Sequence, residues 1–297
     1  MISTGLQKLD KFLSGGIPDG IIVDIFGGRG TGKTLLSFQL MINSIKNGGN
    51  VLYLDTSGGF RPERILEIQK ELKIDIDLLE KITVSRITNT SEQIKSLQNI
   101  AENNFSLMVI DNITDLFSYE YQSDESVFEK NSLFMKYMHE LSKFAITNKI
   151  PIVVTNMIRT MDDKEVENMQ SAIDPFTHIK IHLFKNSSDF NGEIYWALKK
   201  EKFSYTITKI GLSDNTEDFY FVDELKLLQL TYQKGSLRIF HVFSVSLIYS
   251  LSLSLSFLDV WESLKNLTDN PTSNLLSVIY SSNIIISPIA FFACLKY

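Results

Sequence analysis

Gly27-Gly28-Arg29-Gly30-Thr31-Gly32-Lys33-Thr34 is the stretch that decides the fold, and it matches the phosphate-binding pattern G-x-x-x-x-G-K-[ST] at every required position. Residues 21–26 before it form a short β-rich run, and residues 35–41 after it open an apolar stretch with helical periodicity. A glycine loop between a strand and a helix lets backbone N–H groups point at an anion. This phosphate loop (residues 27–34) is therefore predicted to bind a nucleoside triphosphate.

Three side chains are candidates for handling the phosphates. Lys33, the catalytic candidate, is predicted to reach the β- and γ-phosphates, and the Thr34 hydroxyl is predicted to hold Mg²⁺. Residues 107–110 are apolar and lead directly into Asp111, which is typical of a parallel strand covered on both faces with an acid at its carboxyl end. We interpret Asp111 as a second Mg²⁺ ligand, with an ordinary helix cap as the alternative.

Composition restricts the classes of function. The net charge is −6, so the chain has no overall basic field that would gather nucleic acid. Its only cysteine is Cys294, which excludes an internal disulfide framework and fits a reducing cytoplasm. The first twenty residues contain four charged side chains and no apolar run, so no signal peptide is expected. We therefore expect a cytoplasmic protein.

Strand-like and helix-like segments alternate up to residue 156. Strands are predicted at 21–26, 51–55, 82–85, 107–111 and 151–156, and helices at 4–13, from 35, from 62, at 90–103 and at 128–148. Residues 157–174 look polar and loop-like, whereas 177–185, 193–200 and 202–210 alternate apolar and polar residues. These patterns predict an α/β fold with a mostly parallel central sheet and antiparallel edge strands, within a nucleotide-binding domain spanning residues 1–215.

The last third of the chain has a different composition. After an expected linker at 216–235, residues 236–297 are poor in charge, and residues 239–258 contain no Asp, Glu, Lys or Arg. The length of 239–258 suits a membrane span, but six serines argue against a good one. Three interpretations stay open for 236–297: a weak membrane hairpin, extra strands, or a segment with no evolved structure.

The first 214 residues resemble the RecA/RadA recombinase superfamily, and most of all its archaeal RadB branch. The residues that carry the resemblance are Ile2-Ser3-Thr4-Gly5 with Leu9-Asp10, Gly15-Gly16-Ile17, the phosphate loop, Asp55-Thr56, Phe60-Arg61-Pro62-Glu63-Arg64-Ile65, Asp111 and Val153-Val154-Thr155-Asn156. The Phe60–Ile65 run separates recombinase relatives from the KaiC-like signalling ATPases, which are the alternative. The helical domain that precedes the core in RadA has no counterpart here, which favours RadB.

This resemblance implies a RecA-like core that binds ATP and Mg²⁺. Arg64 would then stack its planar guanidinium on the adenine; a surface helix arginine is the equally weighted alternative. The implied role is that of an accessory or mediator in DNA recombination and repair, with a RadA-type recombinase or a second copy as partner. A membrane-attached ATPase is a further alternative, and it depends on the tail inserting into a bilayer.

Two departures from the family pattern point to weak ATP hydrolysis. Ser57 stands where the resembled recombinases have the Glu that positions the attacking water, and serine is neither acidic enough nor long enough to replace it. Losing such a group costs about 10²–10⁴ in rate. Met157 stands where the family has a Gln that senses the γ-phosphate, and a thioether cannot make that hydrogen bond.

Few basic residues are available for DNA. In residues 116–129 and 157–174, which match the family's DNA-binding loops, acidic residues outnumber basic ones, and phosphate neutralisation supplies most non-specific affinity. The remaining candidates are Lys199, Lys200 and Lys202, which interleave with aromatic residues. A solvated hairpin end is the simpler interpretation of these lysines, so we expect any DNA binding to be weak.

Overall fold

The structure is a computed structural model that describes residues 1–97, 100, 104–161 and 164–214. The expected linker at 216–235 and the charge-poor tail at 236–297 lie outside the described residues, so the three interpretations of the tail stay open. Among the residues that are described, no helix is long and apolar enough to cross a membrane.

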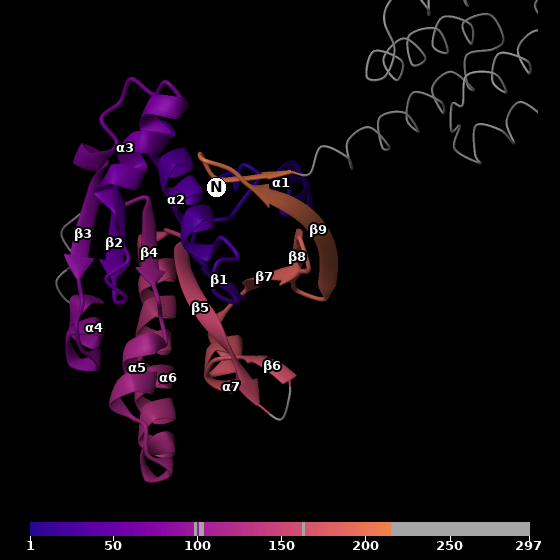
Figure 1. The fold of residues 1–297 in the computed structure, drawn as a ribbon. Helices are drawn as coiled ribbons and strands as arrows, with labels where there is room; N and C mark the ends of the chain where they lie inside the picture. Colours follow the sequence, from indigo (N-terminus) through magenta and orange to yellow (C-terminus); the bar gives the residue numbers. More distant parts are fainter. Residues whose placement is uncertain (98–99, 101–103, 162–163, 215–297) are drawn as a thin grey trace, which may run out of the picture. The chain divides into compact units, whose positions relative to one another are not determined.

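One sheet organises the described part of the chain, with the strand order β10-β9-β8-β7-β1-β5-β4-β2-β3 (Figure 1). Its strands are β1 (Ile22–Gly27), β2 (Val51–Asp55), β3 (Ile82–Arg86), β4 (Leu107–Asp111), β5 (Ile152–Met161), β7 (Ile179–Asn186), β8 (Asp189–Trp196), β9 (Lys199–Ile207) and β10 (Leu212–Asp214). The strands from β3 to β7 in this order pair in parallel, and those from β7 to β10 pair antiparallel. The predicted α/β fold is confirmed.

Helices cover both faces of this sheet. They are α1 (Gln7–Phe12), α2 (Lys33–Lys46), α3 (Pro62–Glu71), α4 (Thr90–Ser96), α5 (Asp115–Glu120), α6 (Val127–Asn148) and α7 (Gln170–Ile173), with 3₁₀ turns η1 (Leu79–Lys81), η3 (Asp124–Ser126) and η4 (Asp174–Phe176). Val23 and Ile25 join the core formed with α1, α2 and α3, whereas Ile22 joins the core formed with α5, α6 and α7. This alternation along β1 follows from the period of two in a strand.

The expectation that residues 157–174 form a loop is wrong. Strand β5 continues to Met161 and returns as β6 (Lys164–Glu167), and the pair is in register from Ile158 opposite Glu167. The two strands of a hairpin satisfy each other's backbone N–H and C=O groups, so a hairpin can form without an apolar face. The polar side chains of this segment therefore looked like those of a loop. Two boundaries also differ. Helix α4 ends at Ser96, although a helix was expected over 90–103. The turn between β8 and β9 lies at Ala197, where φ is 53°, although a strand was expected over 193–200.

Candidate nucleotide-binding site

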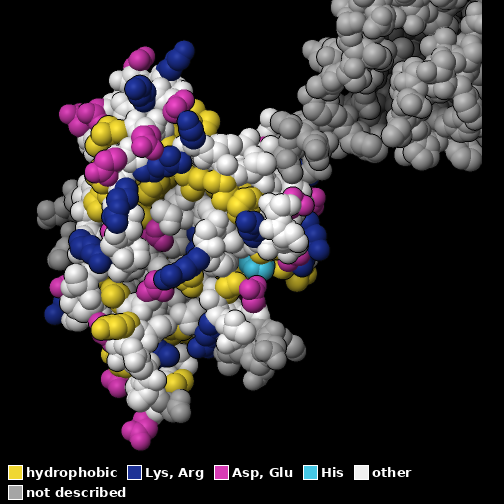
Figure 2. Space-filling model, viewed as in Figure 1, with side chains coloured by type: hydrophobic (Ala, Val, Ile, Leu, Met, Phe, Trp, Pro, Cys, Tyr) yellow, Lys and Arg dark blue, Asp and Glu magenta, His cyan; other side chains and the backbone are white. Residues whose placement is uncertain are grey.

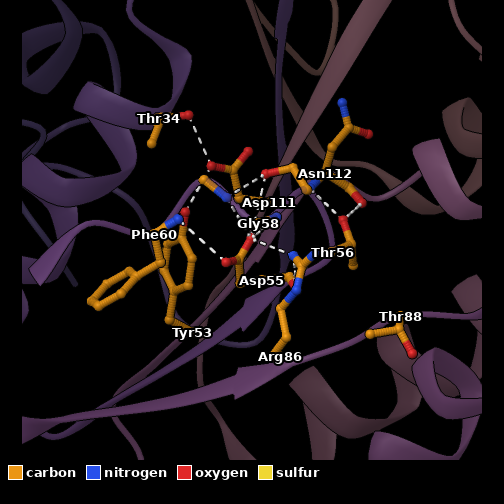
Figure 3. Close-up of polar contacts among 12 residues, drawn as sticks. Thr34, Tyr53, Asp55, Thr56, Gly58, Phe60, Arg86, Thr88, Asp111 and Asn112 are labelled. Atoms are coloured by element: carbon orange, nitrogen blue, oxygen red, sulfur yellow. Dashed lines mark hydrogen bonds and ion pairs between the residues drawn. The ribbon is translucent and has the colours of Figure 1, made fainter.

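The carboxyl ends of four parallel strands meet at one edge of the sheet. Gly27 at the end of β1 pairs with Met157 of β5, and Asp55 at the end of β2 pairs with Asp111 at the end of β4. Open α/β sheets bind their ligands outside this edge. Figure 3 shows Thr34, Tyr53, Asp55 and Asp111 gathered there.

The backbone of the phosphate loop requires its glycines. Gly30 and Gly32 have φ angles of 74° and 95°, in the left-handed region that other residues rarely adopt. A Cβ on Gly27 would lie 2.0 Å from the carbonyl oxygen of Leu183 in β7. The loop then runs directly into α2, which begins at Lys33. This geometry fits an anion held by backbone N–H groups at a helix N-terminus.

Lys33 lies inside the loop that it belongs to. Its Nζ donates hydrogen bonds to the carbonyl oxygens of Gly27, at 2.8 Å, and Gly28, at 2.7 Å. Burial lowers the pKa of Lys33, and the negative charges of Asp111 and Asp115 act against that shift. The ammonium is therefore held at the position from which a lysine can reach bound phosphates.

Asp111 is the centre of a group of hydroxyls contributed by three elements. One carboxylate oxygen accepts from Thr34 Oγ1, at 2.8 Å, and from the Tyr53 hydroxyl, at 2.7 Å, while the other accepts from Thr155 (Figure 3). Burial and the charge of Asp111 raise the pKa of Tyr53, so the phenol stays a donor. Thr34 and Asp111, the two predicted Mg²⁺ ligands, are thus in direct contact, and their hard oxygen atoms are of the kind that Mg²⁺ prefers.

The turn after β2 is organised by Asp55. Its carboxylate accepts hydrogen bonds from the N–H groups of Gly58, at 2.7 Å, and Gly59, at 3.1 Å, and pairs with Arg86 at 3.3 Å. Ser57 is exposed, and its Oγ contacts Asp55 and the N–H of Gly59 within the same turn. The described contacts of the Ser57 side chain therefore lie within its own turn.

Sequence reasoning missed Asp115, the first residue of α5. Its side chain is partly buried, and burial together with Asp111 raises its pKa, while Lys33 and Arg29 lower it. These charge interactions place the Asp115 carboxylate in the electrostatic environment of the phosphate loop. The only available signal was its position four residues after Asp111, which no motif singles out.

The antiparallel edge of the sheet also supports the loop, which the sequence did not indicate. The hydroxyl of Tyr205 in β9 donates to the carbonyl oxygen of Thr31 at 2.7 Å. Leu212 of β10 packs so closely on Gly32 that a Cβ there would lie 3.0 Å from it. Apolar alternation predicted the strand but carried no information on this contact.

Arg64 lies in the first turn of α3 and forms an ion pair with Glu67 at 2.9 Å. No hydrogen bond or ion pair described for Arg64 joins it to the phosphate loop, so its proposed adenine contact stays a prediction. The structure thus brings together Lys33, Thr34 and Asp111, and leaves Arg64 on a separate helix.

Two of the three candidate DNA-binding lysines form ion pairs with the same glutamate of their own hairpin. Lys200 and Lys202 pair with Glu193 at 2.8 and 3.3 Å. Burial opposes ionisation of Glu193, but hydrogen bonds from Lys200, Tyr195 and Lys202 lower its pKa to about 2. Lys199 is exposed. Figure 2 shows basic and acidic side chains interspersed on the visible face of the described residues.

A charge cluster that is buried except at Asp174 ties β1 to the β5–β6 hairpin. Lys180 of β7 pairs with Glu167 of β6, with Asp174 and, at 3.6 Å, with Asp24 of β1. Asp24 is fully buried, and desolvation followed by the charge of Glu167 raises its pKa well above the ordinary value. Glu167 also accepts from Asn156 Nδ2 at 2.9 Å, so the cluster reaches the strand end beside the phosphate loop.

The sheet order, the glycine loop and the acid at the end of β4 define an α/β P-loop domain with a RecA-like core. Residues 1–218 match the Rad51 family. The chain is also 34% identical over 174 residues to the DNA repair and recombination protein RadA of Cenarchaeum symbiosum (strain A), covering 55% of this chain and 44% of that relative. The chain therefore belongs to the Rad51 family, and it spans less than half the length of this curated relative.

Proposed function

We propose that the chain is an ATP-binding, RadB-like member of its family that assists a RadA-type recombinase in DNA recombination and repair. The observation that carries this proposal is a complete phosphate loop with its Thr34–Asp111 hydrogen bond, next to a β2 turn that carries Ser57, where the resembled recombinases have an acid. Such a site binds ATP and hydrolyses it slowly. Slow turnover suits a protein in which the nucleotide sets the conformation.

Different groups of the site would bind the phosphates of ATP and the Mg²⁺ ion. Backbone N–H groups of the phosphate loop and Lys33 hold the phosphates, and Thr34 with Asp111 would hold Mg²⁺. Mg²⁺ would supply neutralisation of the charge that develops on the phosphate oxygens. Ser57 is exposed, and its described contacts, Asp55 and Gly59, belong to its own turn. Met157, beside Gly27 in the sheet, has no polar group to sense the γ-phosphate.

The limited basic surface supports an accessory role. Of the candidate lysines, Lys200 and Lys202 pair with Glu193, and this lowers their capacity to neutralise phosphates. A protein partner, either a recombinase or a second copy of this chain, therefore fits better than strong independent DNA binding. The Rad51 family match favours this role over a KaiC-like signalling ATPase. A membrane-attached ATPase depends on residues 236–297, which lie outside the described residues.

A pull-down with purified RadA-type recombinase tests the proposal. The immobilised chain is incubated with the recombinase in Mg²⁺-ATP, in Mg²⁺-ADP and without nucleotide, with Lys33→Ala as the matched control. We expect more recombinase to be retained in ATP than in the other two conditions, and no ATP dependence with Lys33→Ala. Equal background retention in all conditions would contradict the accessory role.

A further inference from the structure

Asp111 is held by side chains from both strands that neighbour β4. In the sheet order, β4 lies between β2 and β5. Tyr53 of β2 and Thr155 of β5 are fully buried, and each donates its hydroxyl to the Asp111 carboxylate. Thr34, at the start of α2, donates a third hydroxyl (Figure 3). Contacts with three separate elements therefore fix the position of this carboxylate.

The two oxygens of Asp111 are not equally occupied. A carboxylate offers about four lone-pair sites, two on each oxygen. Oδ2 accepts from both Thr34 and Tyr53, whereas Oδ1 accepts from Thr155 alone. Oδ2 is therefore saturated, and one lone pair of Oδ1 stays open. A cation beside this carboxylate can use one of its oxygens but not both.

The ring of Tyr53 is held independently of its hydroxyl. It packs against Phe60, with the ring centroids 4.9 Å apart, and against Phe38, with the centroids 5.9 Å apart. These contacts involve only the ring, whereas the hydroxyl contacts Asp111 at 2.7 Å. A phenylalanine at this position would keep the ring contacts and remove one donor from Oδ2.

We propose that Tyr53, by saturating Oδ2 of Asp111, makes the nucleotide-binding site prefer Mg²⁺ over Ca²⁺. Ca²⁺ takes about six to eight oxygen ligands and often uses both oxygens of one carboxylate. Mg²⁺ is smaller, keeps several of its waters and needs few protein ligands beside the phosphates. Tyr53 is thus a positioning residue that acts through Asp111. The inference rests on the proposed function, because it requires a nucleotide-bound metal ion at Thr34 and Asp111.

Thr155 provides a contrast within the same cluster. Loss of its hydroxyl would open a second lone pair on Oδ1 and leave Oδ2 saturated, so one cation still could not use both oxygens. Loss of the Tyr53 hydroxyl would open a lone pair on Oδ2 in addition to the open one on Oδ1. Each change removes one hydroxyl from the same carboxylate, and only the change at Tyr53 makes coordination by both oxygens possible.

The nucleotide affinity of the full chain in three metal conditions tests this role. Equilibrium dialysis with β,γ-imido-ATP, an analogue that resists hydrolysis, gives a Kd in Mg²⁺, in Ca²⁺ and in EDTA. We expect the wild-type chain to bind more tightly in Mg²⁺ than in Ca²⁺. Tyr53→Phe should lower this preference by about 10-fold, because changing a hydrogen-bond partner of a metal ligand typically costs that much in metal affinity or more. Its Kd in EDTA should stay at the wild-type value.

Two further variants separate the role of Tyr53 from general damage to the core. Thr155→Val should leave the preference for Mg²⁺ near that of wild type, because Oδ2 stays saturated. Tyr137→Phe is the matched control and should change none of the three Kd values. Tyr137 is also a buried tyrosine, but it belongs to the core formed with α5, α6 and α7, and no described hydrogen bond joins its hydroxyl to Asp111.

The assignment is overturned if Tyr53→Phe keeps the wild-type preference, or if the wild-type chain binds no more tightly in Mg²⁺ than in Ca²⁺. An equal loss of affinity in all three conditions would overturn it too, because Tyr53 would then support only the fold. A shift in Thr155→Val as large as in Tyr53→Phe would show that saturation of Oδ2 does not set the preference. Failure of the wild-type chain to bind the nucleotide in any condition would instead refute the proposed function, so the two failures are distinguishable.

Discussion

Replacing Lys180 with methionine should destabilise the described domain strongly, because Lys180 is the cation shared by Asp24, Glu167 and Asp174. Methionine keeps most of the apolar stem and removes the charge. Lys180 Nζ lies within ion-pair distance of all three carboxylates, so its charge offsets the mutual repulsion of these acids. Desolvation offsets part of this, and breaking a buried pair typically costs about 3–5 kcal/mol. We expect a loss of that size in the free energy of unfolding.

Asp24→Asn is the matched variant, and its effect should be small or stabilising. Both Asp24 carboxylate oxygens lack a hydrogen-bond partner among the described residues, and burial raises the pKa of this carboxyl. A carboxyl whose pKa is higher in the folded state than in the unfolded state contributes stability at low pH. This contribution is fully present below the pKa of the unfolded state, about 4, and is lost as pH rises through the pKa of the folded state. Asp24→Asn should therefore flatten the decline in stability above about pH 4. It should also recover part of the loss in Lys180→Met.

Urea unfolding of the full chain from pH 5 to 8, followed by fluorescence and circular dichroism, measures these effects. The predicted loss in Lys180→Met corresponds to a melting temperature lower by roughly 6–20 °C for a domain of about 200 residues. The reasoning is refuted if Lys180→Met stays within about 1 kcal/mol of wild type. It is also refuted if Asp24→Asn is the more damaging of the two changes.

Three further predictions concern the turn, the supporting strand and the tail. Ser57→Glu should raise the single-turnover hydrolysis rate by up to about 10²-fold, and an unchanged rate would show that this position does not limit turnover. Tyr205→Phe should lower the free energy of unfolding in urea by about 1–3 kcal/mol and weaken ATP binding, because it leaves the Thr31 carbonyl without its donor. An unchanged ATP affinity would show that β9 does not support the phosphate loop. A chain ending at residue 215 should stay folded and bind ATP, because every motif lies before that point; an insoluble product would show that the tail completes the core.

Apolar patterns and one motif were enough to predict the parallel half of the sheet. Val51–Asp55 and Leu107–Asp111 are short apolar runs that end in an acid, and such runs are strands in a sheet covered on both faces. Thr34 and Asp111 could each be picked out as Mg²⁺ candidates, one from a motif and the other from a strand end, and the structure joins them by a hydrogen bond.

The parts that the sequence did not reveal depend on contacts between distant segments. The β5–β6 hairpin has a polar sequence, and its side chains are held by tertiary partners such as Lys180, thirteen residues after Glu167. The hydrogen bond from Tyr205 to Thr31 spans 174 residues and leaves no local pattern. Asp115 differs from a surface helix acid only through its neighbours in space, which a single sequence does not give.

The central claim is that Lys33, Thr34 and Asp111 bind Mg²⁺-ATP, and the ATP-dependent shift in melting temperature tests it most directly. At an ATP concentration about 100 times its Kd, mass action stabilises the native state by roughly 2.7 kcal/mol. For a domain of this size we expect a rise of roughly 5–11 °C in the wild-type chain with Mg²⁺-ATP. Lys33→Ala should lose most of that rise while melting near the wild-type temperature without nucleotide. A Lys33→Ala variant that keeps the full rise would contradict the account.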